Sequence, residues 1–166
     1  MQRDEAISLL VRSELLELTV HERRALIETA VGEGLLEEQP SLAELTDNPM
    51  NEGFEEVISG ALRTRYVGTK NDFIAEQLHR RNLGDSSVIG EPELLAACPC
   101  CRFRALLLRG QYDICPVCGW EDTGVDDLLV YSGPNHATLA EAQENFAMTE
   151  AEGATDDAAR KYARLS

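Results

Sequence analysis

The sequence predicts an α+β fold, with a helical N-terminal region over residues 1–90 and a small four-cysteine β-hairpin module with a C-terminal helix over residues 91–166. Apolar residues recur at helical spacing through most of the chain up to Leu83. All five cysteines lie between Cys98 and Cys118, around a short apolar segment. A chain of 166 residues accommodates one ordinary domain with a small appended module.

Four helices are predicted in the N-terminal region. The first has its leucines along one side, and Thr19 with Glu22 forms a capping box that opens the second. Residues 35–50 contain two prolines and are predicted to be a connector, while Gly84 stands where the fourth helix should stop. The predicted helices span residues 3–17, 20–31, about 52–62 and about 71–82.

The second region is predicted to contain a β-hairpin and two helices. Residues 86–97 lack helical periodicity and lead into residues 102–108 and 111–114, which we expect to pair across a turn at Arg109 and Gly110. The leucines 106–108 are also compatible with a helix. A loop over residues 132–135 precedes a second capping box, Thr138 to Glu141. The helices are predicted to span residues 138–149 and 156–164.

The net charge is −15, from 30 acidic and 15 basic residues. Such a surface is a poor match for nucleic acid, whose phosphates require clustered lysine and arginine, and a better match for a basic protein partner. The simpler alternative is that the acidity only keeps the protein in solution. Because no stretch approaches the length of a membrane span or has the form of a signal peptide, we expect a cytoplasmic protein.

The cysteines follow the pattern C-x2-C-x13-C-x2-C, with a proline after the first cysteine of each pair. A C-P-x-C turn aims two sulfurs at one point, and the intervening residues are long enough to bring the two pairs together. This pattern predicts a Cys₄ zinc ribbon that holds a structural Zn²⁺ and leaves no open coordination position. Iron remains an alternative metal, whereas a redox pair or a disulfide fits the spacing, the odd count and the expected reducing compartment less well. The predicted ligands are Cys98, Cys101, Cys115 and Cys118.

The fifth cysteine is Cys100. Aligning CPCC with the second turn, CPVC, places Cys100 opposite Val117. We therefore expect Cys100 to be a spare thiol whose side chain points away from the metal.

A tryptophan and an acidic run follow the second turn, and they are candidates for binding a partner protein. The alternative is that Trp120 packs over a small hairpin with little core of its own. The run does not match a calcium loop, and the three histidines have no catalytic partners at recognisable spacing, although His136 is a conceivable substitute ligand. With no nucleophile motif or phosphate loop, the chain is predicted not to be an enzyme. The candidate partner-binding residues are Trp120, Glu121, Asp122, Asp126 and Asp127.

The chain resembles the cysteine-rich CPCC family of small bacterial proteins. The resemblance is carried by CPCC, by YDICPVCGWEDTG and by SGPNHATLAEAQENF, and the N-terminal phrases EAISLL, VGTKND and VIGEPE resemble longer members. It implies a small zinc-ribbon-like module and an association with toxins, for which such proteins would serve as immunity proteins.

We therefore expect a non-enzymatic immunity protein that neutralises a basic toxin by direct binding. The alternative is a zinc-ribbon adaptor or regulator that contacts nucleic acid or the transcription or translation machinery, for which Arg102, Arg104 and Arg109 would supply the only basic strip. A metal-thiol enzyme would require a reactive cysteine, and Cys100 is the one candidate.

Overall fold

The computed structural model describes residues 1–32, 48–84, 87–151 and 157–165. The chain forms two compact units. The helical unit comprises Met1–Val67 and Ile74–Glu91, and the cysteine unit comprises Gly68–Phe73 and Pro92–Ser166. The sequence-based boundary between residues 90 and 91 stays a prediction. The predicted connector at 35–50 lies largely outside the described residues.

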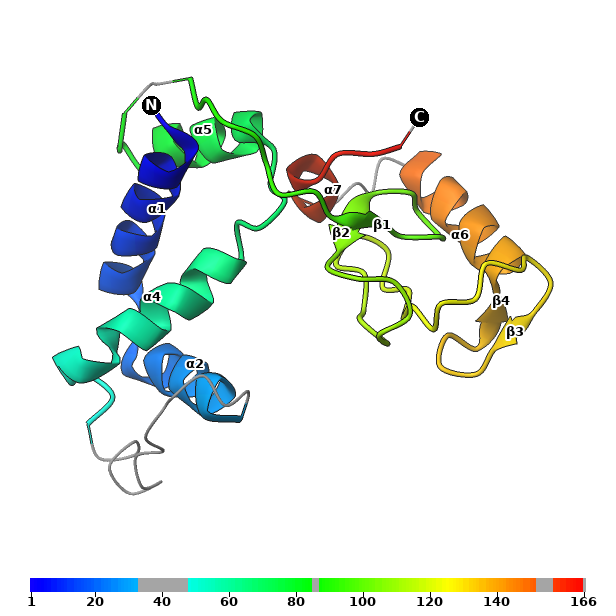
Figure 1. The fold of residues 1–166 in the computed structure, drawn as a ribbon, viewed down its shortest axis with the longest axis horizontal. Coiled ribbons are helices and arrows are strands. Elements are labelled where there is room, and N and C mark those ends of the chain that lie inside the picture. The colour runs from blue at the N-terminus through cyan, green and yellow to red at the C-terminus, as the bar shows by residue number, and fades with distance from the viewer. Residues whose placement is uncertain (33–47, 85–86, 152–156, 166) are drawn as a thin grey trace. The chain divides into compact units, whose positions relative to one another are not determined.

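The helical unit contains the predicted helices, except for residues 71–73 at the start of the last one, which belong to the cysteine unit. Helix α4 packs against both α1 and α2, as Figure 1 shows. The predicted capping box is present, because the Thr19 amide donates to the Glu22 carboxylate at 2.8 Å and the Glu22 amide donates to the Thr19 hydroxyl at 3.3 Å. The helices are α1 (Arg3–Glu17), α2 (Val20–Gly32), the 3₁₀ turn η1 (Glu52–Phe54), α4 (Glu55–Thr64) and α5 (Asn71–Arg80).

Aliphatic side chains fill the core of the helical unit, and two arginines are buried beside them. Arg3 donates to the Tyr66 carbonyl at 3.0 Å and Arg23 donates to the Leu15 carbonyl, also at 3.0 Å. These bonds matter because a buried cation without hydrogen-bond acceptors is costly. The largest fully buried side chains of this core are Leu10, Ile27, Ile58, Leu62, Ile74 and Leu78.

The cysteine unit consists mostly of turns and loops with short strands (Figure 1). The predicted hairpin between residues 102–108 and 111–114 is wrong, because β2 pairs antiparallel with β1, which precedes the first cysteine. Residues 112–114 instead run beside residues 121–122, with Ile114 bridged to Glu121. The strands are β1 (Ala96–Ala97), β2 (Arg104–Leu106), β3 (Tyr131–Ser132) and β4 (Ala137–Thr138), and β3 pairs antiparallel with β4.

Two helices complete the cysteine unit. The predicted second capping box opens α6 (Leu139–Ala151), because the Thr138 amide donates to Glu141 at 2.8 Å and the Glu141 amide donates to the Thr138 hydroxyl at 3.3 Å. Helix α7 spans Asp157–Lys161. After it, the C-terminal residues lie along the first cysteine turn, since the Arg104 amide donates to the Ala163 carbonyl at 2.8 Å.

Candidate metal centre

Four sulfur atoms meet in the interior of the cysteine unit. All four lie within 4.8 Å of one another, and two pairs, Cys98 with Cys118 and Cys101 with Cys115, are each 3.6 Å apart. A zinc–sulfur bond of about 2.3 Å places the corners of a tetrahedron about 3.8 Å apart, whereas a disulfide bond is about 2.05 Å long. The donor set therefore fits one tetrahedral metal ion and does not fit a pair of disulfides.

The first cysteine turn is closed by two backbone hydrogen bonds. The Cys98 amide donates to the Phe103 carbonyl at 2.9 Å, and the Arg102 amide donates back to the Cys98 carbonyl at 2.9 Å. To close the turn, Arg102 adopts a positive φ of 67°, a conformation that is uncommon for a residue with a side chain.

The second turn repeats this geometry. The Cys115 amide donates to the Trp120 carbonyl at 2.8 Å, and the Gly119 amide donates to the Cys115 carbonyl at 2.9 Å. Gly119, with φ 74°, holds the position that Arg102 holds in the first turn. The two turns are thus equivalent residue by residue, and each presents its two sulfurs to the same point.

The pKa values of the clustered thiols are shifted in opposite directions. Hydrogen bonding with Cys101 lowers the pKa of Cys115 below its usual range, and the same contact raises the pKa of Cys101 above its usual range. The Val117 amide adds a hydrogen bond that also lowers the pKa of Cys115. The cluster therefore stabilises a thiolate at Cys115, and the thiolate is the form of cysteine that binds a metal.

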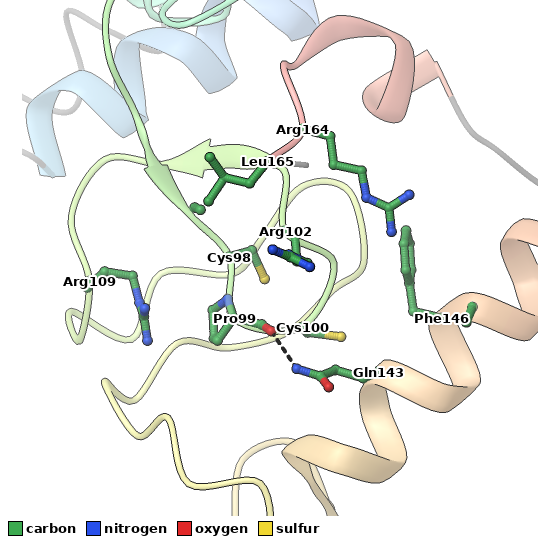
Figure 2. A pocket seen from close by; sticks show the side chains of 11 residues that line it. Cys98, Pro99, Cys100, Arg102, Arg109, Gln143, Phe146, Arg164 and Leu165 are labelled. Carbon is green, nitrogen blue, oxygen red and sulfur yellow. Dashed lines mark hydrogen bonds between the residues drawn. The ribbon is translucent and has the colours of Figure 1, made fainter.

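Cys100 lies outside the four-sulfur cluster. Figure 2 shows its side chain directed away from the Cys98 sulfur and towards α6, where Gln143 donates to the Pro99 carbonyl at 2.9 Å. Cys100 is buried, and its hydrogen bond with Cys118 is the chief reason why the pKa of the Cys118 thiol is raised to about 12. The spare thiol thus packs between the first turn and α6 and borders one of the clustered sulfurs.

A buried carboxylate holds the second turn in place. Asp122 is 0% exposed and accepts hydrogen bonds from Arg109 Nε at 2.8 Å, from the Gly110 amide at 2.7 Å and from the Gly124 amide at 3.3 Å. Burial acts to raise the pKa of Asp122, but the hydrogen bonds from Arg109 and Gly110 outweigh it, so the pKa lies below its ordinary value. Residues 110 and 124 pack closely against each other around the carboxylate, which requires glycine at both positions. A Cβ on Gly124 would lie only 3.1 Å from the Gly110 Cα.

The loop between β3 and β4 supplies a second support. Asn135 accepts from the Glu121 amide at 2.8 Å and donates to the Glu121 carbonyl at 2.9 Å and to the Ser132 hydroxyl at 2.7 Å. The Asn135 side chain thereby pairs with both the amide and the carbonyl of Glu121, as the backbone of a neighbouring strand would.

The C-terminus supports the first turn, a contact that no sequence pattern predicted. Arg164 donates to the Cys101 carbonyl at 3.1 Å and to Glu150 at 2.7 Å. Its guanidinium lies 5.2 Å from the centre of the Phe103 ring and 5.8 Å from that of Phe146 on α6. These contacts join α6 to the first turn.

The five candidate partner-binding residues differ in their exposure to solvent. Trp120 is 5% exposed and Asp122 is 0% exposed, because the tryptophan packs in the core of the cysteine unit and the aspartate binds Arg109. Most of both side chains is therefore covered by the chain itself, and their role in binding stays a prediction. Glu121 is half-buried, whereas Asp126 and Asp127 are exposed, and their role in binding stays a prediction. Among the described residues, the four-sulfur cluster does not include His136.

The family comparison concerns the same part of the chain. Residues 96–165 match the family described as cysteine-rich CPCC, whereas the resembling N-terminal phrases lie outside the matched residues. No curated protein and no solved structure matches the chain. Across the described ranges, no helix is both long and apolar enough to cross a membrane.

Proposed function

We propose that residues 96–165, which match the cysteine-rich CPCC family, hold one structural zinc ion in a non-enzymatic protein-binding protein. The observation that carries the proposal is the convergence of four sulfurs within 4.8 Å. Four cysteine ligands saturate a tetrahedral zinc ion, so no position is left for water or substrate. The metal would then serve folding alone.

Elemental analysis of the protein purified without added metal tests the zinc assignment. We expect one zinc per chain and no visible absorption. Iron in the same four-thiolate site would colour the protein, so a coloured, iron-containing product would contradict the assignment of zinc while leaving the four ligands intact.

We propose further that the chain is an immunity protein for a basic toxin, which it neutralises by direct binding. The net charge of −15 supports this partner, and zinc with four thiolates would contribute a further charge of about −2. Opposite charges on two proteins speed their association and make it sensitive to salt. A partner of high positive charge is therefore the best electrostatic match.

Nucleic acid is a poorer match even at Arg104 and Arg109, two arginines of the expected basic strip. Arg104 donates to the Leu95 carbonyl at 3.2 Å, and Arg109 binds Asp122 at 2.8 Å and Asp126 at 2.6 Å. Because Arg109 is neutralised by two carboxylates, little of its charge remains for a phosphate.

Co-expression with the product of the neighbouring gene tests the immunity proposal. We expect a basic product that arrests growth, rescue by this chain, and a complex that weakens as the salt concentration rises. Growth arrest without rescue, together with no complex at low salt, would contradict the proposal. The zinc analysis is independent of that outcome.

A further inference from the structure

Four consecutive apolar side chains are exposed on the cysteine unit, and we call them the apolar strip. Leu128 is 47% exposed, Leu129 82%, Val130 46% and Tyr131 62%. Single exposed leucines are common on protein surfaces, but a run of this length is unfavourable in water unless it has a use. The strip is therefore a candidate contact surface.

A small pocket adjoins the strip. Its volume is about 170 Å³. Trp120 and Leu139, which are 5% and 3% exposed, form part of its wall together with Val130 and Pro134. Asp127 also lines it, so the pocket is apolar with an acidic residue at its border. It has room for one apolar side chain of a partner, which is the usual form of an anchor site.

The strip is held in place by hydrogen bonds. The Leu129 amide donates to the Asp127 carboxylate at 2.9 Å, and the Ala140 amide on α6 donates to the Leu128 carbonyl at 3.0 Å. Tyr131 belongs to β3, which pairs with β4. A surface ordered before binding loses little conformational entropy when a partner arrives.

The charges around the strip are negative. Asp126 is 72% exposed and Asp127 is also exposed. The sequence contains no lysine or arginine between Arg109 and Arg160, and the Arg109 side chain is paired with Asp122 and Asp126. Asp126 is thus already paired with Arg109, and no lysine or arginine of this long segment can pair with Asp127, so a cation for Asp127 would come from the partner.

We infer that the apolar strip and its pocket bind an apolar segment of a partner protein that carries lysine or arginine beside it. One apolar side chain of that segment enters the pocket, and a basic residue beside it faces Asp127, which lines the pocket. The inference rests on the proposed binding function and assigns it a surface. A second copy of this chain is the poorer occupant, because it would place the same acidic residues opposite one another.

A peptide titration tests the inference. The probe is a short synthetic peptide of leucine and lysine, compared with a leucine–glutamate peptide of equal length. Trp120 is the only tryptophan of the chain and lines the pocket, so its fluorescence reports binding there. We expect the lysine peptide to change the fluorescence and the glutamate peptide to have no effect.

Two serine variants locate the contact. Leu129→Ser should weaken binding of the lysine peptide by about tenfold, as expected for loss of one apolar contact. Leu94→Ser is the matched control, since Leu94 is also 82% exposed and lies outside the strip; its affinity should not change. Asp127→Asn keeps an acceptor for the Leu129 amide, so it should weaken binding only by removing charge.

Three outcomes would overturn the inference: equal affinity of Leu129→Ser and Leu94→Ser, equal binding of both peptides, or concentration-dependent dimerisation that Leu129→Ser abolishes. The last would assign the strip to a second copy. If the neighbouring gene product still binds Leu129→Ser as tightly as the unchanged chain, the proposed function stands and only the surface is wrong.

Discussion

The helical unit and the cysteine unit are built around different kinds of core. Large aliphatic side chains that are fully buried fill the helical unit, whereas four of the nine buried residues in the core of the cysteine unit are cysteines. Burying one leucine or isoleucine side chain contributes about 1.5–3 kcal/mol, and a structural zinc ion contributes about 10–16 kcal/mol. The comparison predicts that the helical unit is stabilised mainly by burial and the cysteine unit mainly by the metal ion proposed for its four cysteines.

Removing one metal ligand should have the most different effects on the two units. In Cys115→Ser we expect loss of zinc and unfolding of the cysteine unit, because about 10 kcal/mol or more of metal binding is lost. The helical unit should keep its helices, since its core contains none of the ligands. Zinc content and the dispersion of amide NMR signals measure the two effects.

Cys101→Val should behave in the same way, because it also removes a clustered sulfur. A Cys115→Ser protein that keeps both a full NMR spectrum and its stability would contradict the view that metal holds this unit together.

A core truncation should give the opposite pattern. Leu62 is 0% exposed, so Leu62→Ala should destabilise the helical unit by about 2–5 kcal/mol through lost burial and a cavity. Zinc content should stay at one per chain. Urea unfolding followed by circular dichroism gives the change in stability, and loss of zinc from this variant would show that the two units do not fold independently.

Replacing the Asp122 carboxylate should have a smaller effect on stability, and this effect should depend on pH. Asp122→Asn should destabilise the cysteine unit by about 3 kcal/mol, because the buried group loses charged hydrogen bonds with Arg109. Since the folded-state pKa of Asp122 is below its unfolded value of about 3.9, its contribution is complete above that pH and is lost as the pH falls towards the lower folded pKa.

The difference in unfolding free energy between the unchanged protein and Asp122→Asn should therefore be constant from neutral pH to about pH 4 and shrink below it. Metal release at low pH affects both proteins, so comparing them isolates the carboxylate. A difference that is already absent at neutral pH would contradict the role assigned to Asp122.

The smallest effect is expected at the spare thiol. Cys100→Val copies the second turn, and we expect zinc content to be unchanged and stability to change by less than about 1.5 kcal/mol, as for other substitutions of similar volume. Thermal unfolding with zinc analysis measures both. If this variant loses zinc as Cys101→Val does, Cys100 contributes to metal binding through its contact with Cys118.

Local signals predicted the helices well and the strands poorly. Helix α1 spans Arg3–Glu17 as predicted, and both capping boxes are present, because apolar spacing and caps act within a few residues. The pairing of β2 with β1 depends on which segments flank the first turn once it closes. Short strands carry little periodicity, so the sequence alone suggested the wrong partner.

The sequence by itself determined the α+β class, the charge and the four cysteines that come together, because two equally spaced pairs specify two similar turns. Only the tertiary structure decided what surrounds them: burial of Asp122 against Arg109, the support of the first turn by Arg164, and the exposure of Leu128–Tyr131. Spacing within a turn is a local property of the chain, whereas burial depends on contacts between residues that are distant in the sequence.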